Sequence, residues 1–323
     1  MTTASPPQTQ INSVIALYSN GRIKEALNRV EALIKDYPNE ALLYNISGVC
    51  YKAIDKLDAA VESFEKALAI KPDYTEAYNN LGFTFQGLGQ LDAAVKSYKQ
   101  ALALKPDYFV AHNNLGNAFK ELGQLDDAFK CYKKAITLKP DYTDAHYNLG
   151  NAFKELGQLD DAIKSYEQAL AIDPGYADAY NNLGVTLQEL DQLDAAVKCY
   201  EQAVVLKPDY IDAHNNLGVV LVQLGQLDDA VKCYKQAIAV KPDYAEAHNN
   251  LGNALKDLDQ HNAAIKCYEK ALVIKPDYAK AYRNHGNVLL DLKRLDEALA
   301  SYESAITLNP DLYFLLGDLL HTK

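Results

Sequence analysis

A 34-residue pattern runs through almost the whole of this 323-residue chain and constrains its fold more than any other feature. Residues 109–142 read FVAHNNLGNAFKELGQLDDAFKCYKKAITLKPDY, and the stretch 114–128 recurs without a change as 148–162. Counting in 34s gives nine registers, from 7–40 to 279–312, and a tail at 313–323. A fixed period of this length indicates a repeat architecture, in which each unit buries its apolar faces against its neighbours.

Each register contains two stretches of about 14 residues with apolar side chains at i, i+3 and i+4, which predicts two helices, here called A and B. Position 20 of the register is alanine and position 32 is proline in all nine copies. We expect Gly116 and Ala128 to let the two helices approach closely, with Tyr132 covering the contact. Gly123 lies between the helices, where a left-handed residue is needed. Its equivalents are Asp55, Asp191, Asp259 and Lys293.

The register resembles the tetratricopeptide repeat. The matching residues are His112, Leu115, Gly116, Phe119, Ala128, Tyr132, Ala135 and Pro140. The resemblance implies an all-α fold, a right-handed superhelix or α-solenoid of nine helix-turn-helix repeats plus a C-terminal helix. We expect a disordered lead-in at 1–6, nine repeats over 7–312, and a capping or linking helix at 313–323 that starts a missing segment. The first repeat has Val14, Val30 and Leu33 where the others have glycine, an aromatic residue and alanine, so we expect a divergent cap.

Local patterns also predict where helices begin. Asp73-x-x-Glu76 and Asp243-x-x-Glu246 have the spacing of capping boxes at the start of helix A.

Composition narrows the choice of partner. The net charge is −11, from 32 basic and 43 acidic residues, which disfavours nucleic acid and anionic membranes. No run of about 18 apolar residues could span a membrane, and the polar N-terminus does not read as a secretory signal. Four of the five cysteines share one register position, too far apart for disulfides, so we expect reduced thiols in a cytoplasmic protein.

A row of asparagines marks the candidate binding surface. Helix A should line the inner face of the superhelix, with positions 2, 5, 6, 9 and 12 pointing inward. Position 6 is asparagine in seven successive registers, and position 9 adds further asparagines. An amide offers both a donor and an acceptor, as the backbone of an extended peptide does. We therefore predict peptide binding by Asn80, Asn114, Asn148, Asn182, Asn216, Asn250, Asn284, Asn117 and Asn151. The alternative is that these asparagines hydrogen-bond within or between A helices and only hold the stack.

An asparagine row on a long superhelix resembles the arm of the bacterial type of O-linked N-acetylglucosamine transferases. The resemblance implies that the seven asparagines from Asn80 to Asn284 hold substrate peptides. The tail sequence LLGDLLHTK is similar to the junction with the glycosyltransferase domain in that family. The function expected is a peptide-binding scaffold that recruits substrates for a larger glycosyltransferase. The alternative is a free-standing adaptor that assembles protein complexes.

No enzymatic site is expected within this chain. His112, His146, His214 and His248 share position 4, and one histidine per repeat cannot supply metal ligands at about 2.1 Å. No nucleophile–base pair or phosphate loop is visible, so we predict no catalysis, cofactor or metal. The expected partners are proteins or extended peptides, without nucleic acid or membrane. Self-association through the apolar tail is a further expectation, carried by Phe314, Leu315, Leu316, Leu319 and Leu320.

Overall fold

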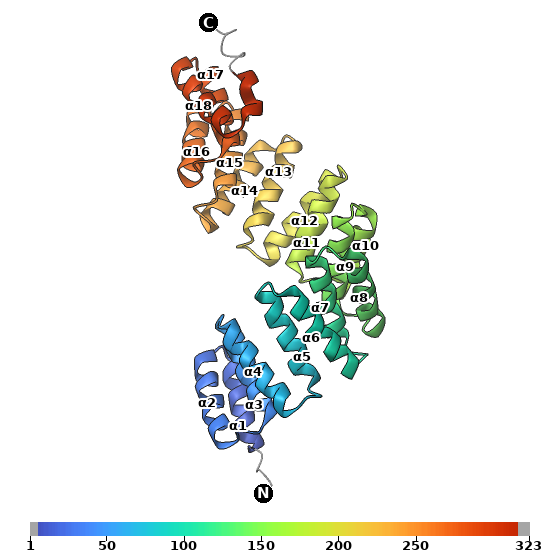
Figure 1. The fold of residues 1–323 in the computed structure, drawn as a ribbon. Helices are drawn as coiled ribbons and strands as arrows, with labels where there is room; N and C mark the ends of the chain where they lie inside the picture. The colour runs from blue at the N-terminus through green and yellow to red at the C-terminus, as the bar shows by residue number, and fades with distance from the viewer. Residues whose placement is uncertain (1–5, 316–323) are drawn as a thin grey trace. The chain divides into compact units, whose positions relative to one another are not determined.

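The computed structural model describes residues 6–315, which hold 18 α-helices, a short 3₁₀-helix and no strand (Figure 1). The A helices are α1 Gln8–Ser19, α3 Ala41–Ala53, α5 Thr75–Gly87, α7 Phe109–Glu121, α9 Thr143–Glu155, α11 Ala177–Glu189, α13 Ile211–Gln223, α15 Ala245–Asp257 and α17 Ala279–Asp291. The B helices are α2 Ile23–Asp36, α4 Leu57–Ile70, α6 Leu91–Leu104, α8 Leu125–Leu138, α10 Leu159–Ile172, α12 Leu193–Leu206, α14 Leu227–Val240, α16 His261–Ile274 and α18 Leu295–Leu308. The predicted all-α repeat fold is confirmed.

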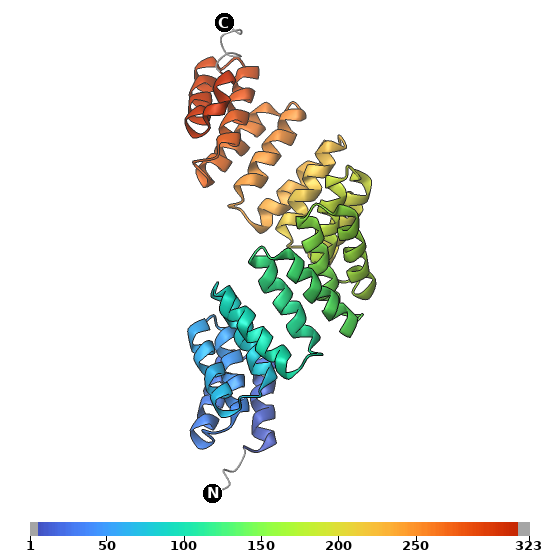
Figure 2. The same ribbon diagram turned by 45° about the vertical axis from the view of Figure 1, so that its right-hand side comes forward.

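The chain divides into two compact units, unit 1 at Met1–Gln158 and unit 2 at Leu159–Lys323. Within each unit the helices stack side by side in sequence order, as both views show (Figure 2). In unit 1, α7 packs on α8 of its own repeat and on α5, α6 and α9 of the neighbouring repeats. In unit 2, α13 packs in the same way on α14 and on α11, α12 and α15. Burial in each unit therefore comes from stacked neighbours rather than from one central core.

An aromatic ring lying on a glycine holds the two helices of a repeat together. Tyr132 of α8 is completely buried, and a Cβ added to Gly116 of α7 would lie 2.5 Å from its Cε1 atom. The same clash, at 2.5–2.8 Å, recurs at the pairs Gly48–Phe64, Gly82–Tyr98, Gly184–Tyr200, Gly218–Tyr234, Gly252–Tyr268 and Gly286–Tyr302. The predicted close approach at Gly116 is confirmed, because only a residue without a side chain leaves room for the ring.

The first repeat fills the same space with different residues. Val14 of α1 takes the place of the glycine and Val30 of α2 takes the place of the aromatic ring, and both are completely buried. The two changes compensate in volume, since one side chain grows where the other shrinks. The divergent cap is thus packed rather than open.

The turn between helices A and B depends on one left-handed residue. Gly123 has φ +72°, and a Cβ placed on it would meet nothing within 4 Å, so backbone conformation rather than space favours glycine here. Asp55, Asp191, Asp259 and Lys293 adopt the same region, with φ between 57° and 59°. The left-handed conformation predicted for this position is confirmed at the three aspartates, and Lys293 adopts it too although lysine fits it less well.

The predicted capping boxes are wrong. Helix α5 has Tyr74 as its N-cap, and α15 has Tyr244, without a side-chain capping hydrogen bond in either case. Asp73 and Asp243 lie one residue too early. The backbone carbonyl of Tyr74 instead accepts the N–H of Ala77 at 3.1 Å, so the chain itself closes the first turn.

Only residues 313–315 of the predicted C-terminal helix are described, and that helix stays a prediction. Pro310–Phe314 forms a 3₁₀-helix, in which Tyr313 and Phe314 are 69% and 59% exposed, whereas Leu315 is buried. The remaining tail residues, including Leu316, Leu319 and Leu320, lie outside the described residues. Residues 1–5 of the predicted lead-in also lie outside them.

The contact between glycine and tyrosine predicts a large difference between two glycines. Gly116→Ala should lower the free energy of unfolding by about 1–3 kcal/mol, because the new methyl group must displace the Tyr132 ring. Gly87→Ala at the end of α5 is the matched control, since its Cβ would meet only Leu57 at 3.4 Å. We expect the control to be neutral or slightly stabilising in urea denaturation. Equal effects of the two changes would contradict the packing described here.

Candidate functional site

The position-6 asparagines, here called the amide row, are joined to the preceding repeat by side-chain hydrogen bonds. Six of the seven donate an Nδ2–H to the Oδ1 atom of the position-5 asparagine one repeat earlier, at 3.0–3.2 Å; the repeat before Asn182 has Tyr147 at position 5. In unit 1 the bonds run from Asn80 to Asn45, Asn114 to Asn79 and Asn148 to Asn113. In unit 2 they run from Asn216 to Asn181, Asn250 to Asn215 and Asn284 to Asn249.

The two asparagine positions differ in exposure. The position-5 side chains are buried between A helices, with Asn113 3% and Asn215 4% exposed, whereas the amide row is half-buried. The expectation that position 5 faces the groove is therefore wrong. A buried acceptor needs a partner, and the next repeat supplies it. The bonds between A helices that the alternative interpretation predicted are present.

These bonds leave part of each amide in the row unused. An asparagine side chain has two N–H donors and a carbonyl oxygen with two lone pairs. In the described part of the chain, Asn114, Asn148 and Asn216 make no further hydrogen bond beyond the one to position 5. Asn250 also accepts a bond from Asn249 at 3.3 Å, which occupies one of its lone pairs. The bond to position 5 also fixes the amide plane, so the remaining groups are held in one orientation.

The position-9 asparagines are tied to the buried tyrosines. Asn117 accepts the Tyr132 hydroxyl at 2.8 Å, and Asn253 accepts the Tyr268 hydroxyl at 2.8 Å. Burial raises the pKa of the Tyr132 phenol, which therefore stays protonated as the donor. The Asn117 carbonyl oxygen is thus engaged by the core, and its amide nitrogen is the group left for a ligand. Asn151, the other predicted position-9 residue, is half-buried on α9.

One exposed aromatic residue on the A helices of unit 1 was not predicted from the sequence. Phe83, at position 9 of its repeat, is 48% exposed, and the Lys52 ammonium lies 4.2 Å from the centre of its ring. Burial lowers the pKa of Lys52. The signal available in the sequence was an aromatic residue at a position that elsewhere holds asparagine, valine or isoleucine.

The histidines of position 4 have a packing role. The Nε2 atoms of His112, His146, His214 and His248 lie 2.9–3.0 Å from the carbonyl oxygens of the turn prolines six residues earlier. Each histidine therefore joins helix A to the turn that precedes it. Within residues 6–315, no three His, Cys, Asp or Glu side chains gather in a way that could hold a metal ion.

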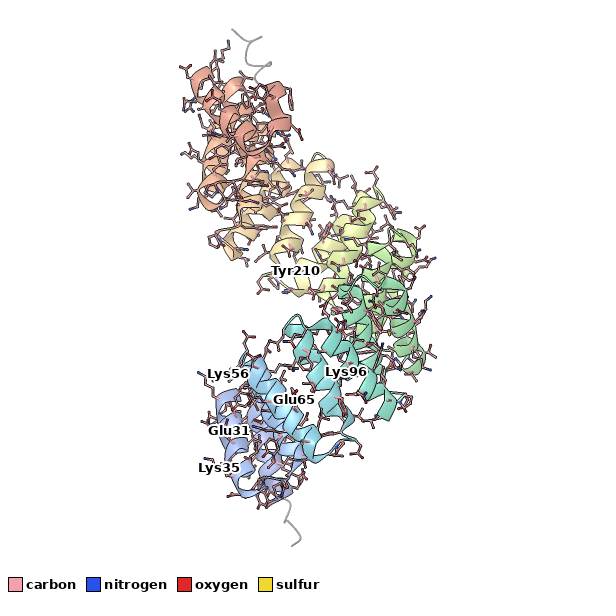
Figure 3. All side chains as sticks on the ribbon, viewed as in Figure 1. Glu31, Lys35, Lys56, Glu65, Lys96 and Tyr210 are labelled. Carbon is pink, nitrogen blue, oxygen red and sulfur yellow. The ribbon has the colours of Figure 1, made fainter. Side chains whose placement is uncertain are left out.

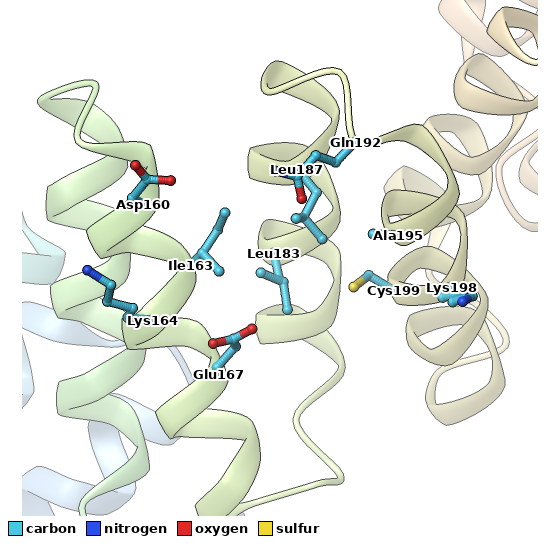
Figure 4. A pocket seen from close by; sticks show the side chains of 10 residues that line it. All are labelled: Asp160, Ile163, Lys164, Glu167, Leu183, Leu187, Gln192, Ala195, Lys198 and Cys199. Atoms are coloured by element: carbon cyan, nitrogen blue, oxygen red, sulfur yellow. The ribbon is translucent and has the colours of Figure 1, made fainter.

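The outer surface carries charged B-helix side chains, among them exposed Lys35, Glu65 and Lys96 (Figure 3). In unit 2 it also has an open groove of about 730 Å³ between α10, α11 and α12 (Figure 4). Leu183, Leu187 and Cys199 lie toward its floor.

Burial raises the pKa of the Cys199 thiol to about 11, so it is protonated and a poor nucleophile at neutral pH. All five cysteines are unpaired.

Comparison with known proteins places the chain in a family. Residues 108–311 match the model of the cilia and flagella-associated protein 70 C-terminal domain, a tetratricopeptide-repeat (TPR) domain, and residues 48–89 and 87–123 match a TPR repeat model. The first match covers more than half of the chain. The chain belongs to this TPR family. No curated protein matches it significantly.

Solved TPR structures resemble the fold. The protein YrrB, described as having an unusual peptide-binding site, is 24% identical with a TM-score of 0.51, over 58% of this chain and 96% of YrrB. The Cut9–Hcn1 tetramer of the APC/C is 18% identical with a TM-score of 0.58, over 93% of this chain and 58% of that chain. MamA is 30% identical with a TM-score of 0.48, over 51% of this chain and 97% of MamA. At these identities, YrrB and Cut9–Hcn1 establish the fold alone.

None of the described helices is both long and apolar enough to cross a membrane.

Removing the donor that serves a position-5 oxygen should destabilise the stack. Asn216→Ala should lower the free energy of unfolding by about 1–3 kcal/mol, because it leaves the buried Oδ1 atom of Asn181 without its hydrogen bond. Val205→Ala, which shortens a side chain that is 70% exposed on α12, is the control and should have little effect. Urea denaturation measures both. An equally small effect of Asn216→Ala would contradict the role of position 5 in the stack.

Proposed function

We propose that the amide row binds extended peptides by their backbone. The observation that carries the proposal is the pair of groups left on amides such as Asn114, Asn148 and Asn216, an N–H donor and a carbonyl acceptor beside it. An extended peptide offers the complementary C=O and N–H at every residue. Affinity would come from main-chain hydrogen bonds, and the sequence of the peptide would matter little.

The spacing of the row suits an extended chain. Neighbouring A helices packed in contact lie about 8–10 Å apart. An extended peptide rises 3.2–3.4 Å per residue, so about three residues separate successive asparagines. The four row residues of unit 2, Asn182, Asn216, Asn250 and Asn284, would then contact a peptide of about ten residues. Shorter peptides should lose contacts in steps of about three residues.

Binding and stacking are compatible roles for one amide. The hydrogen bond to position 5 uses one donor and holds the side chain in place, which lowers the entropy lost when a peptide docks. The description of YrrB as a peptide-binding TPR protein concerns that protein, and its likeness to this chain extends to the fold. The proposal rests on the amide row.

Two cellular settings fit a peptide-binding module of this kind. The first is the substrate-recruiting arm of a larger glycosyltransferase, which the resemblance of the asparagine row suggests. The second is an adaptor that assembles protein complexes. The full-length gene product distinguishes them, because an arm continues into a catalytic domain and an adaptor does not.

Removing two residues of the amide row should weaken binding of unrelated peptides equally. We expect Asn216→Ala with Asn250→Ala to reduce affinity by about 1–3 kcal/mol, since each lost neutral hydrogen bond contributes about 0.5–1.5 kcal/mol. The probes are three fluorescent peptides of about twelve residues that share no sequence pattern, measured by fluorescence anisotropy. Circular dichroism of the variant checks that its helices remain.

The matched control lies on the outer surface. Val205 of α12 is 70% exposed, and Val205→Ala should leave affinity unchanged. If the double variant binds all three peptides as tightly as the parent, the amide row is not the binding site. If it loses its helical signal instead, the asparagines serve only the stack.

A further inference from the structure

The last repeat carries a histidine where its neighbours carry leucine. Position 7 is leucine in six successive repeats, from Leu81 to Leu251, and then becomes His285 on α17. The ring is half-buried between α16 and α18, and its centre lies 6.5 Å from that of Tyr268. An ionisable group therefore occupies a site that the repeat otherwise reserves for a core residue.

The hydrogen bonds around His285 define its tautomer. The Ser301 hydroxyl donates its proton to the Glu297 carbonyl oxygen at 3.1 Å, so it can only accept from the ring. The His285 Nδ1 atom lies 3.0 Å from that hydroxyl oxygen and must carry the proton. The Nε2 atom is then the basic nitrogen, and among the described residues it is shielded from solvent and has no hydrogen-bond partner.

Protonation would place a charged donor at this shielded nitrogen. A buried N–H without an acceptor, on a charged ring, is strongly unfavourable. The charged groups that face the ring are Glu269 of α16 and Arg294 and Glu297 at the start of α18. Arg294 forms a bidentate ion pair with Glu297, which reduces what that carboxylate can offer the ring. Burial is the largest influence and lowers the pKa of His285.

We propose that His285 makes the last repeat acid-labile, so that its protonation releases α18 from α17 while the preceding repeats stay folded. In a repeat array each repeat contacts only its neighbours, so one destabilised repeat can open locally while the others stay folded. Asn284, the last residue of the amide row, belongs to α17 and adjoins His285. Opening would therefore remove the helix that packs on this end of the surface proposed to bind peptide, although the pH response itself does not depend on that proposal.

The surroundings of His285 determine how the stability of the last repeat changes with pH. A histidine with a lowered pKa in the folded state binds its proton more readily once the helix opens. Stability of the last repeat is therefore complete above the ordinary histidine pKa of about 6.5 and falls as the pH drops below it. Each unit by which folding lowers the pKa raises the opening equilibrium about tenfold at acid pH.

Hydrogen exchange on the full chain at pH 7.5 and pH 5, corrected for intrinsic rates, tests the proposal. We expect protection of α18 to fall at least several-fold more than that of α14 at the lower pH. His285→Leu restores the residue of the other repeats and should abolish this extra loss. His214→Gln, which changes a histidine bonded to the Pro208 carbonyl, should retain it.

A second measurement needs no variant. The ¹⁵N chemical shifts of the His285 ring should show the Nδ1–H tautomer at pH 7.5 and no protonation near pH 6.5, the ordinary histidine pKa. The proposal is overturned if α18 loses equal protection in the wild type and His285→Leu proteins. It is also overturned if His285 becomes protonated near that pH while α18 stays protected.

Discussion

The structure depends on one contact, the aromatic ring of helix B lying on the glycine of helix A. The ring can reach its buried site only because position 8 lacks a Cβ, and a methyl group there would lie well inside contact distance of the ring. This contact fixes how closely the two helices of a repeat approach. It recurs with nearly the same geometry in the repeats that have the pair, so successive repeats of each unit stack in the same way.

The same tyrosines connect the core to the inner face. Where position 9 is asparagine, as at Asn117 and Asn253, the buried hydroxyl bonds to that side chain. In two repeats where it is not, a glutamine at position 12 does so, as Gln86 does for Tyr98 and Gln188 does for Tyr200. In these repeats the buried hydroxyl therefore has an acceptor at one of two positions of helix A. Regular packing also brings six of the seven row asparagines within hydrogen-bond distance of the repeat before.

Much of this organisation could be predicted from the sequence because the nine repeats of the chain can be compared with one another. The alanine, glycine and proline positions have direct steric meanings, and the left-handed turn at Gly123 implied the same conformation for Asp55 and Lys293. The helix starts could not be placed as well, since capping depends on a shift of one residue that Asp73 alone does not reveal. The division between buried position 5 and half-buried position 6 was also out of reach. Positions 5 and 6 are adjacent on one helix, and which of them is buried depends on the angle to the next helix, which the sequence does not reveal.

That division matters for function because it separates the two roles of the asparagines. Asn113 and Asn215 are buried acceptors within the stack, whereas Asn114 and Asn216 hold donors and acceptors that the stack does not use. The link to the preceding repeat uses one N–H of the row amide and leaves its second N–H and its carbonyl oxygen. For this reason we propose that the row binds a ligand that carries amides of its own.

Backbone substitution in the peptide tests this assignment most directly. Replacing single amide groups by esters removes a donor and weakens an acceptor without changing any side chain. We expect the loss of affinity to recur at about every third position, matching the spacing of the amide row. Ester analogues that bind as well as the parent peptide, while side-chain changes abolish binding, would contradict the central claim.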